Sequence, residues 1–449
     1  MQLRKLCLPV AGALLLSLAG CGGDEERNDV DDQLTQVLQT AAGTEGLDYF
    51  TMPESDDYSS IPQDANNPVT AEKVALGKML FHETAIGTNP KVASGVGTYS
   101  CASCHHSRAG FQAGVGQGIG EGGSGFGLTG ENRIANAAYL ADQLDIQPIR
   151  SPSAMNAAYQ ELMLWNGQFG ANGANVGTEA QWDPTTPVIT NELGYDGLET
   201  QAIAGLGVHR MDFEGSVVQD NAEYIAMFDA AFPSVPVQDR YSRENAGLAI
   251  AAYERTLLSN EAPFQQWLKG DRAAMSEIEK KGAILFFGKA GCNNCHTGPA
   301  LSSMEFYALG MDDLDASGQP YAGAIPDGAR LGRGGFTGVA ADNYKFKVPQ
   351  LYNLKDSPFY GHGASFTSIE EVVRYKNAGI AQNTEVPADQ LAADFSPISL
   401  TEEEIGQLTA FLESSLHDPD LARYNPASLP SGYCFPNNDA QSRTDLGCN

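Results

Sequence analysis

The sequence predicts a mainly α-helical chain with two tandem domains of similar build and long loops. Three observations lead to this prediction. The pattern Cys-x-x-Cys-His occurs twice, as Cys101-Ala102-Ser103-Cys104-His105 and as Cys292-Asn293-Asn294-Cys295-His296. A similar amphipathic segment precedes each copy, and a strongly helical segment follows each copy further along the chain. The 449 residues suffice for two or three domains, and 49 glycines and 23 prolines fit compact domains with long loops.

Cys-x-x-Cys-His is the attachment signature of c-type haem, in which two thiols hold the porphyrin and the histidine binds the iron. For a single copy, a redox dithiol or half a zinc site is the alternative. The motif occurs twice, and neither copy has a further Cys-x-x-Cys pair that could complete a zinc site with it. This argues against both alternatives. We therefore expect two covalently bound c-type haems in two cytochrome c-like domains. The residues expected to hold them are Cys101, Cys104, His105, Cys292, Cys295 and His296.

The first residues resemble a bacterial lipoprotein signal. Two basic residues precede an apolar run over residues 6–18, which is too short to span a bilayer. Leu18-Ala19-Gly20-Cys21 resembles a lipobox, whose cysteine is acylated and becomes the mature N-terminus. Ordinary cleavage nearby, leaving Cys21 free, is the alternative. We expect residues 1–20 to be a signal peptide and Cys21 to anchor a periplasmic protein to the cell membrane or outer membrane.

Acidic residues dominate the charge of the chain. Residues 21–66 are rich in Asp, Ser and Pro, and we expect a flexible tether there, with one weakly helical piece around Leu34, Val37 and Leu38. The formal net charge of −29 argues against a nucleic-acid partner, because phosphates would be repelled. It favours a basic electron donor or high solubility.

The first domain is expected over residues 67–262. Its first helix should begin at Thr70, a capping residue. That helix carries Gly77-Lys78-Met79-Leu80-Phe81, which is similar to Gly282-Ala283-Ile284-Leu285-Phe286 before the second haem motif. A glycine inside a helix costs about 1 kcal/mol, so both glycines should permit close packing. Chance similarity of two amphipathic helices is the alternative to a duplicated domain.

A glycine-dense loop over residues 110–130 follows the first motif and should bring backbone close to a porphyrin edge; a flexible linker is the alternative. Residues 244–258 form the helix expected to close the first domain.

The second domain is expected over residues 263–430, closed by a helix that the capping box Thr401-Glu402-Glu403-Glu404 begins. In the tail, residues 431–449, Cys434 and Cys448 are expected to form a disulfide in an oxidising compartment. Two free thiols are the alternative.

From about residue 68 to 417 the chain resembles the bacterial di-haem cytochrome c peroxidases and their MauG-like relatives. The matching segments are Leu76-Gly77-Lys78-Met79-Leu80-Phe81, Leu164-Trp165-Asn166-Gly167, residues 251–258, residues 346–353 and Pro358-Phe359-Tyr360-Gly361-His362-Gly363. The resemblance implies that the haem on His296 receives electrons or stores an oxidising equivalent, while the haem on His105 meets hydrogen peroxide. It places Trp165 between the haems; a buried aromatic residue is the alternative.

The chain departs from this family at the peroxide side. No histidine lies between residues 110 and 130, where inactive resting members carry an iron ligand, so the His105 iron is expected to be open. Where the family has a glutamate before a methionine, this chain has Arg210-Met211. His209 and Arg210 could then act as proton shuttle and charge stabiliser, or could be a surface pair.

The chain also differs from the family at the position of the distal ligand of the second haem. The family carries methionine, or tyrosine in MauG-like members, and the matching position here is Lys376, with Tyr375 one residue away. A lysine binds iron only as the neutral amine, which burial favours. Lys376, Tyr375 and an open site all remain, with Met304 and Met311 as outside options.

The family also holds calcium between its haems, through an asparagine and carbonyls near a Thr-x-Pro segment. Arg150 and Asp356 stand at those positions here. The resemblance therefore makes calcium doubtful, and we expect either an Arg150–Asp356 ion pair in its place or a different mode of metal binding by Asp356.

Together, these observations predict a lipid-anchored periplasmic di-haem oxidoreductase that reduces hydrogen peroxide. A small cytochrome c or cupredoxin would supply electrons through the His296 haem and Trp165. Two alternatives remain: a MauG-like oxidase of a protein or small organic partner, and a di-haem electron carrier without substrate chemistry. Lys376 favours the first, because hard ligands lower the haem potential.

Overall fold

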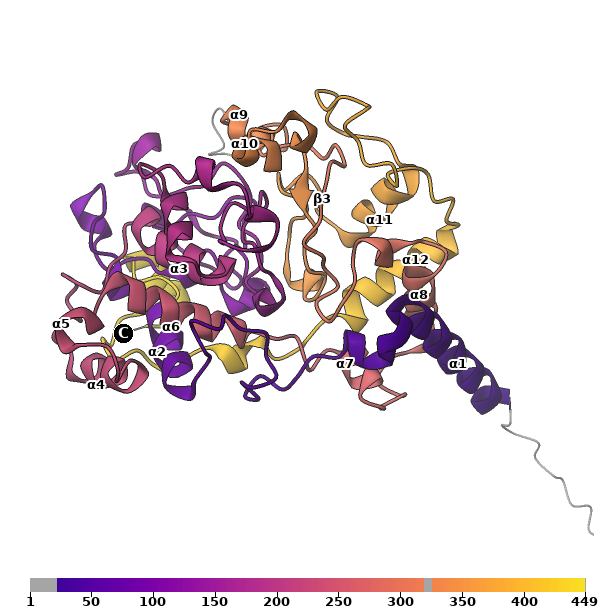
Figure 1. The fold of residues 1–449 in the computed structure, drawn as a ribbon, viewed down its shortest axis with the longest axis horizontal. Coiled ribbons are helices and arrows are strands. Elements are labelled where there is room, and N and C mark those ends of the chain that lie inside the picture. Colours follow the sequence, from indigo (N-terminus) through magenta and orange to yellow (C-terminus); the bar gives the residue numbers. More distant parts are fainter. Residues whose placement is uncertain (1–21, 319–324, 449) are drawn as a thin grey trace, which may run out of the picture.

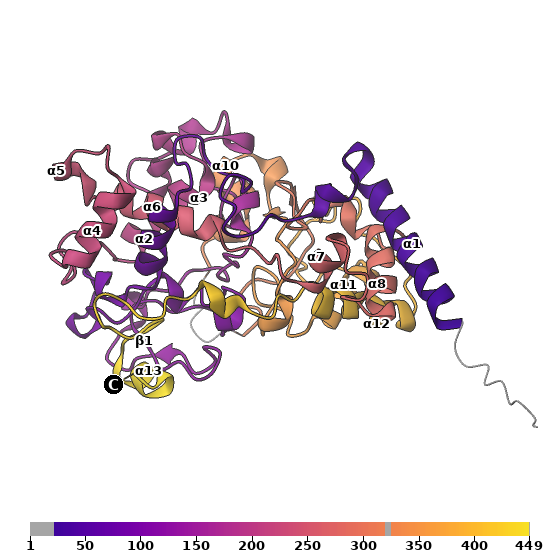
Figure 2. The same cartoon turned by 90° about the horizontal axis from the view of Figure 1, so that it is seen from below.

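A computed structural model describes residues 22–318 and 325–448. The chain forms two lobes side by side, one built mainly from its first half and the other from its second half (Figures 1 and 2). The mainly α-helical prediction is confirmed, because strands occur only as two short antiparallel pairs among the described residues. These pairs are β1 (Gly123–Ser124) with β2 (Ile134–Ala135), and β3 (Phe306–Tyr307) with β4 (Phe346–Lys347).

The first lobe contains five helices, and all but the shortest contribute buried residues to one apolar core. They are α2 (Ala71–His82), α3 (Gly197–Val208), α4 (Ala222–Ala231), α5 (Val237–Arg240) and α6 (Arg243–Arg255). Helix α2 begins as the sequence predicts, since the Thr70 hydroxyl accepts a hydrogen bond from the Lys73 backbone N–H at 3.3 Å. Helix α6 is the closing helix, with a face of buried alanine and leucine residues turned to the core.

The second lobe repeats this plan with α7 (Pro263–Leu268), α8 (Glu277–Phe287), α9 (Asp327–Arg330), α10 (Arg333–Thr337), α11 (Ile369–Ala378) and α12 (Glu402–Ala410). The capping box of α12 forms, because the Thr401 hydroxyl accepts from Glu404 N–H and Glu404 accepts from Thr401 N–H. A π-helical turn, Phe411–Ser415, extends α12.

The two repeated glycines lie at equivalent helix crossings. A Cβ atom on Gly77 of α2 would lie 1.9 Å from the Ala249 carbonyl oxygen of α6. A Cβ atom on Gly282 of α8 would lie 2.0 Å from the Gln407 carbonyl oxygen of α12. The predicted close packing is therefore confirmed in both lobes. Each lobe sets the helix before its haem motif against its closing helix.

The predicted flexible tether over residues 21–66 is wrong for its described part. Helix α1 (Gly22–Ala42) and the 3-10 helix η1 (Gly43–Phe50) pack on α8 of the second lobe (Figure 1). The side chains of Leu34, Leu38 and Phe50 have no exposed surface. The helical spacing of a few apolar residues outweighs the acidic composition, because the second lobe offers these residues an apolar partner.

A buried polar contact also fixes α1. The Trp267 indole N–H donates to Asp31 Oδ1 at 2.7 Å, and Lys280 Nζ lies 2.8 Å from the same oxygen. A paired carboxylate with two donors can be buried without a large penalty. The segment before the first domain is thus a structural part of the second lobe.

The C-terminal tail crosses in the opposite direction and lies on the first lobe (Figure 2). The Pro436 carbonyl accepts hydrogen bonds from the hydroxyls of Ser100 and Ser103, beside the first haem motif. The predicted Cys434–Cys448 disulfide is confirmed, and α13 (Ala440–Leu446) lies between the two cysteines.

The predicted signal peptide and the lipid-bearing Cys21 lie outside the described residues. Within the described part of the chain, no helix combines the length and apolar character needed to cross a bilayer.

Candidate functional site

The first haem motif forms a short helical turn, Cys101–Ser103, that leads into His105. The His105 Nδ1 atom lies 3.2 Å from the Phe111 carbonyl oxygen, so Nδ1 donates its proton there. This leaves Nε2 as the atom for iron, and fixes the ring orientation in the way that metal-binding histidines require. Burial lowers the pKa of His105 to about 4, which keeps the imidazole neutral.

The second motif repeats this geometry. The turn Cys292–Asn294 leads into His296, whose Nδ1 atom lies 3.0 Å from the Leu301 carbonyl oxygen. Burial lowers the pKa of His296 to about 4. Cys292 and Cys295 form no disulfide, and neither do the two cysteines of the first motif. The residues of both motifs therefore fit a covalently held haem with a histidine ligand.

A cavity of about 340 Å³ adjoins the second motif. Cys292, Cys295 and His296 form one side of it, and apolar residues such as Phe286 and Leu408 contribute to the rest. A partly open, mainly apolar space beside a histidine whose Nδ1 donates to a backbone carbonyl suits a porphyrin.

Of the four ligand candidates, Lys376 and Met311 line this cavity. Burial lowers the pKa of Lys376 to about 8, which makes the neutral amine far more accessible near neutral pH than in an exposed lysine. The Tyr375 hydroxyl instead donates a hydrogen bond to the Leu309 carbonyl, and neither Tyr375 nor Met304 lines the cavity. The geometry therefore favours Lys376 over Tyr375.

Trp165 lies on the first-lobe side of the same cavity. Its indole N–H donates to the Arg150 carbonyl oxygen at 2.8 Å, and its own carbonyl accepts from Lys347 N–H at 2.7 Å. The indole ring meets His362 edge to face, with centroids 6.3 Å apart. Trp165 is thus held in one orientation where the two lobes meet.

On the side of the first motif, His209 is positioned by a carboxylate. The His209 Nδ1 atom lies 2.9 Å from Asp145 Oδ2, so the imidazole points its Nε2 away from this contact. Burial lowers the pKa of His209, but the Asp145 carboxylate outweighs it, and the pKa lies above its ordinary value. This arrangement suits a group that accepts and returns a proton at Nε2.

Arg210 is placed differently from His209. Its guanidinium pairs with the buried carboxylate of Glu121 and donates to the Gln143 carbonyl at 3.0 Å. The Arg210 carbonyl in turn accepts from the Tyr99 hydroxyl at 2.9 Å. Since its Nη1 is engaged by Glu121 of the glycine-rich loop and by the Gln143 carbonyl, Arg210 suits holding that loop better than stabilising a substrate.

The glycine-rich loop approaches the first motif through its backbone. A Cβ atom on Gly118 would lie 2.8 Å from Cys104 Sγ, and one on Gly120 would lie 2.2 Å from Asp145 Oδ2. At Gly118 the loop therefore packs closely on a cysteine of the first haem motif, which agrees with the predicted approach of its backbone to a porphyrin edge. Gly120 leaves room for the carboxylate that holds His209.

The expected Arg150–Asp356 ion pair is wrong. Arg150 donates to neutral oxygens, including Ser357 Oγ at 2.8 Å, whereas Asp356 pairs with His417 at 3.1 Å. The tertiary structure decides this, because it brings His417 beside Asp356 although the two residues lie far apart in the sequence. Arg150 stands where the family has a calcium ligand, and its buried guanidinium would repel a calcium ion. These residues therefore do not fit the ion there.

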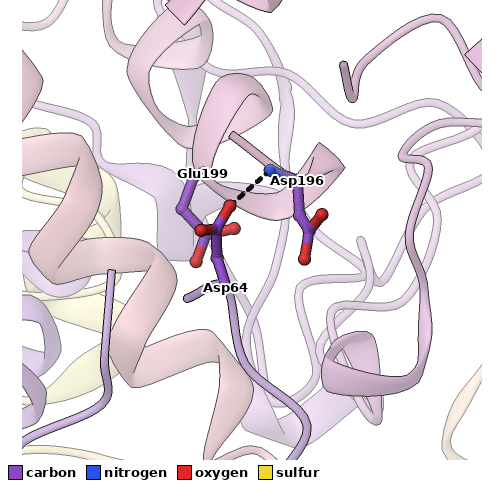
Figure 3. Close-up of side chains that lie close together, drawn as sticks. All are labelled: Asp64, Asp196 and Glu199. Carbon is purple, nitrogen blue, oxygen red and sulfur yellow. Dashed lines mark hydrogen bonds between the residues drawn. The ribbon is translucent and has the colours of Figure 1, made fainter. Parts of the chain in front are cut away.

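An acidic cluster elsewhere resembles a metal site. The carboxylates of Asp64, Asp196 and Glu199 gather at the start of α3 (Figure 3). Both Glu199 oxygens already accept hydrogen bonds from the Arg255 guanidinium, at 2.9 and 2.7 Å. The cluster is therefore an arginine-bound anchor between α3, α6 and the segment before α2.

Sequence reasoning missed Asp145, which holds His209, and the burial of Arg150. It also passed over Glu192, at the end of the helical turn Pro187–Leu193, which is a glutamate followed by an apolar residue. The sequence feature that could have identified Glu192 is the pair Glu192-Leu193. Its residue types are closer to a glutamate–methionine pair at the acidic position than those of Arg210-Met211 are.

Comparisons with known proteins agree with this geometry. The family model for di-haem cytochrome c peroxidase matches residues 71–273. Cytochrome-c peroxidase IdrP1 of Denitromonas iodatirespirans is 30% identical over 393 residues, which are 83% of this chain and 89% of that protein. Methylamine utilization protein MauG of Methylorubrum extorquens is 28% identical over 372 residues, which are 82% of this chain and 84% of that protein.

A solved structure is also similar. It is that of a MauG-like protein associated with microbial copper homeostasis, with a TM-score of 0.57 and 25% sequence identity. The match covers 83% of this chain and 97% of the other. The two-lobed arrangement is therefore shared with a MauG-like protein.

Proposed function

The chain belongs to the di-haem cytochrome c peroxidase family, and from this premise we propose how its two haem sites divide the reaction. The protein is a di-haem c-type oxidoreductase of the peroxidase class. We assign hydrogen peroxide to the His105 haem and the entry of electrons to the His296 haem. The overall reaction takes two electrons and two protons and converts one hydrogen peroxide into two water molecules.

When bound, the haems supply one-electron transfer and an iron centre at which peroxide is activated. The chain supplies the proton transfer. His209 accepts a proton from peroxide at Nε2 and returns it to the departing oxygen, while Asp145 keeps the proton on Nδ1. The Asp145 carboxylate also stabilises the imidazolium that forms between these two steps.

The position of Trp165 is the observation that carries the division of labour. This residue lines the cavity at His296, yet it belongs to the first lobe and is hydrogen-bonded to the backbone of that lobe. An aromatic side chain held rigidly between the sites is suited to carry electrons from one to the other. Its fixed orientation limits the reorganisation that each transfer requires.

Stopped-flow spectroscopy of the holoprotein tests this assignment. The diferric protein and the protein reduced by one electron are each mixed with hydrogen peroxide, and the haem spectra are followed. We expect a rapid reaction with peroxide in at least one of the two states. In Trp165→Phe, only the electron-transfer phase of this reaction should be lost. Absence of any reaction in both states would show a carrier without substrate chemistry.

A MauG-like oxidation of another molecule is the second candidate. Lys376 at the cavity favours it, because a nitrogen ligand lowers the haem potential relative to a thioether and suits oxidising chemistry. Similarity to MauG of Methylorubrum extorquens supports the same view. Fast reaction of the diferric protein, without prior reduction, would favour this candidate over a conventional peroxidase.

The proposed setting is the periplasm, with a lipid on Cys21 as the anchor. The signal-like residues before Cys21 support this proposal, and the acidic chain suits a basic donor such as a small cytochrome c or cupredoxin. Such a donor would dock near the second lobe, where electrons enter.

A further inference from the structure

Arg150 is a buried cation without an acidic partner among the residues that the structure describes. The residue is 2% exposed, and its guanidinium donates to Val115 O at 3.0 Å, Gln112 Oε1 at 3.1 Å and Ser357 Oγ at 2.8 Å. All three acceptors are neutral. Among residues 22–318 and 325–448, no carboxylate forms an ion pair with it, so its charge is not compensated by the described chain.

Lys347 is a second cation of this kind. It is 6% exposed, and its Nζ atom donates to Gln160 Oε1 and to the Leu162 carbonyl at 2.6 Å. These acceptors are also neutral. Burial lowers the pKa of Lys347 to about 7, as expected for an amine whose charge has no counter-charge nearby in the described part of the protein.

Other buried cations of the fold are satisfied in other ways. Arg255, Lys280 and Arg133 each pair with a carboxylate, from Glu199, Asp31 and Asp439 respectively. Arg333 has no such pair, but it lies over the rings of Phe306 and Phe336, at 4.7 and 5.2 Å, and it does not line the cavity.

Arg150 and Lys347 share a location. Both line the cavity of about 340 Å³ that adjoins His296. A buried charge without a partner costs several kcal/mol, so anionic groups inside this cavity would stabilise both cations in their charged form. Haem carries two carboxylates, its propionates, on the edge opposite its thioether bonds.

We propose that Arg150 and Lys347 form the carboxylate-binding subsite of this cavity and take the two propionates of the His296 haem. The proposal rests on the His296 haem site and is independent of which substrate the enzyme uses. Arg150 then has two functions, because its carbonyl holds the Trp165 indole while its guanidinium holds the haem. It is a positioning residue that connects the haem edge to Trp165.

The two cations also set the electrostatics of the haem edge. Paired with them, the propionates remain ionised at neutral pH, and the positive charges favour the reduced haem. Removing one cation should lower the reduction potential of the His296 haem. It should also raise the pKa of a propionate, so that the potential becomes dependent on pH.

The test is spectroelectrochemistry of the holoprotein between pH 5.5 and 8, without peroxide. We expect the His296 haem of the native protein to keep a constant potential across this range. Arg150→Gln and Lys347→Gln should each lower the potential and introduce a pH dependence, and Arg150→Lys should restore most of both. Lys345→Gln, two residues from Lys347 and partly exposed, is the matched control and should leave the potential unchanged.

A potential and pH dependence unchanged in both glutamine variants would overturn the proposal. If these variants do not retain haem, an experimental structure of the native holoprotein decides instead. Propionate oxygens within hydrogen-bond distance of Arg150 and Lys347 support the proposal, and propionates directed elsewhere refute it. Because neither measurement uses peroxide, failure of the peroxidase assignment would leave this result intact.

Discussion

Three histidines of this protein differ in their chemistry. The group that accepts the hydrogen bond from Nδ1 determines the difference. In His105 and His296 a backbone carbonyl accepts a hydrogen bond from Nδ1–H, which leaves the unprotonated Nε2 for iron. In His209 a carboxylate accepts this hydrogen bond, which raises the pKa of the imidazole and favours proton transfer. The chemistry of each residue therefore follows from the charge of its neighbour.

Replacing His209 with alanine should slow the reaction with peroxide by about a hundredfold or more, because the proton acceptor is lost. His417→Ala removes another histidine–aspartate pair, in the second lobe, and should leave the rate unchanged. Stopped-flow kinetics measure both. An unchanged rate in His209→Ala with a large loss in Glu192→Gln would transfer the acid–base role to Glu192.

The pH profile gives a second readout of the same pair. His209 accepts a proton only when neutral, so the rate should fall as the pH drops below its raised pKa. Asp145→Asn removes the carboxylate that raises this pKa, and the acid limb of the profile should move to lower pH. A limb that does not move would show that another group titrates.

Lys376 is expected to be the distal ligand of the His296 haem. Lys376→Met should change the near-infrared charge-transfer band of the ferric haem and raise its potential, since thioether ligation favours the reduced state. Tyr375→Phe is the control and should leave the band unchanged, because the Tyr375 hydroxyl is bonded to a backbone carbonyl. An identical band in Lys376→Met would exclude this ligand.

At the scale of elements, each lobe depends on one crossing of two helices at a glycine. Because Gly77 and Gly282 have no side chain, a backbone carbonyl of the closing helix can occupy the space where a Cβ atom would otherwise lie. Helix α8 is separated from the second haem motif by residues 288–291 only, whereas the longer segment 83–100 lies between α2 and the first haem motif. The crossing therefore places the haem cysteines relative to the core of their lobe.

Gly282→Ala should destabilise the protein by about 1–3 kcal/mol or more, because its Cβ atom would overlap the Gln407 carbonyl. Gly406→Ala, on the partner helix, is a sharp control. Nothing lies within 4 Å of a Cβ atom there, so alanine should stabilise by about 0.5–1 kcal/mol. Thermal unfolding of both variants measures the difference, and equal effects would contradict the crossing.

Helix α1 belongs to the second lobe despite its acidic composition. Leu34→Ala should lower the free energy of unfolding by about 2–5 kcal/mol, since this side chain has no exposed surface. Gln39→Ala, at an exposed position of the same helix, should have little effect. Denaturant unfolding distinguishes them, and no effect of Leu34→Ala would restore the interpretation as a tether.

At the scale of the whole molecule, both ends of the chain cross to the other lobe. Helix α1 covers the second lobe, and the tail with its disulfide covers the first haem motif (Figures 1 and 2). These crossings oppose separation of the lobes, so Trp165 keeps its contacts with both lobes. A fixed distance between redox groups is what electron transfer through the protein requires.

The proposed anchor at Cys21 concerns the whole molecule as well. Cys21→Ala should prevent acylation and move the protein from the membrane fraction to the soluble periplasmic fraction. Cell fractionation with immunodetection measures this, and Cys434→Ala serves as a cysteine control that should remain at the membrane. A native protein found in the soluble fraction would contradict the anchor.

Local patterns of the sequence were sufficient for the haem motifs, the starts of α2 and α12, the paired glycines and the tail disulfide. Each of these depends on residues close in the chain or on chemistry that few residue types perform. The same reasoning failed for the tether, because a weak apolar stripe becomes a helix only when another lobe offers it an apolar surface.

The sequence by itself determined the cofactor and the helical class, since thiols and imidazole at fixed spacing admit little else. Only the tertiary structure decided that Asp145 holds His209, that Lys376 rather than Tyr375 lines the cavity, and that Arg150 has no carboxylate partner in the part of the chain that the structure describes. The physical reason is distance along the chain. These contacts join residues far apart in sequence, and burial sets their charge only after the core has formed.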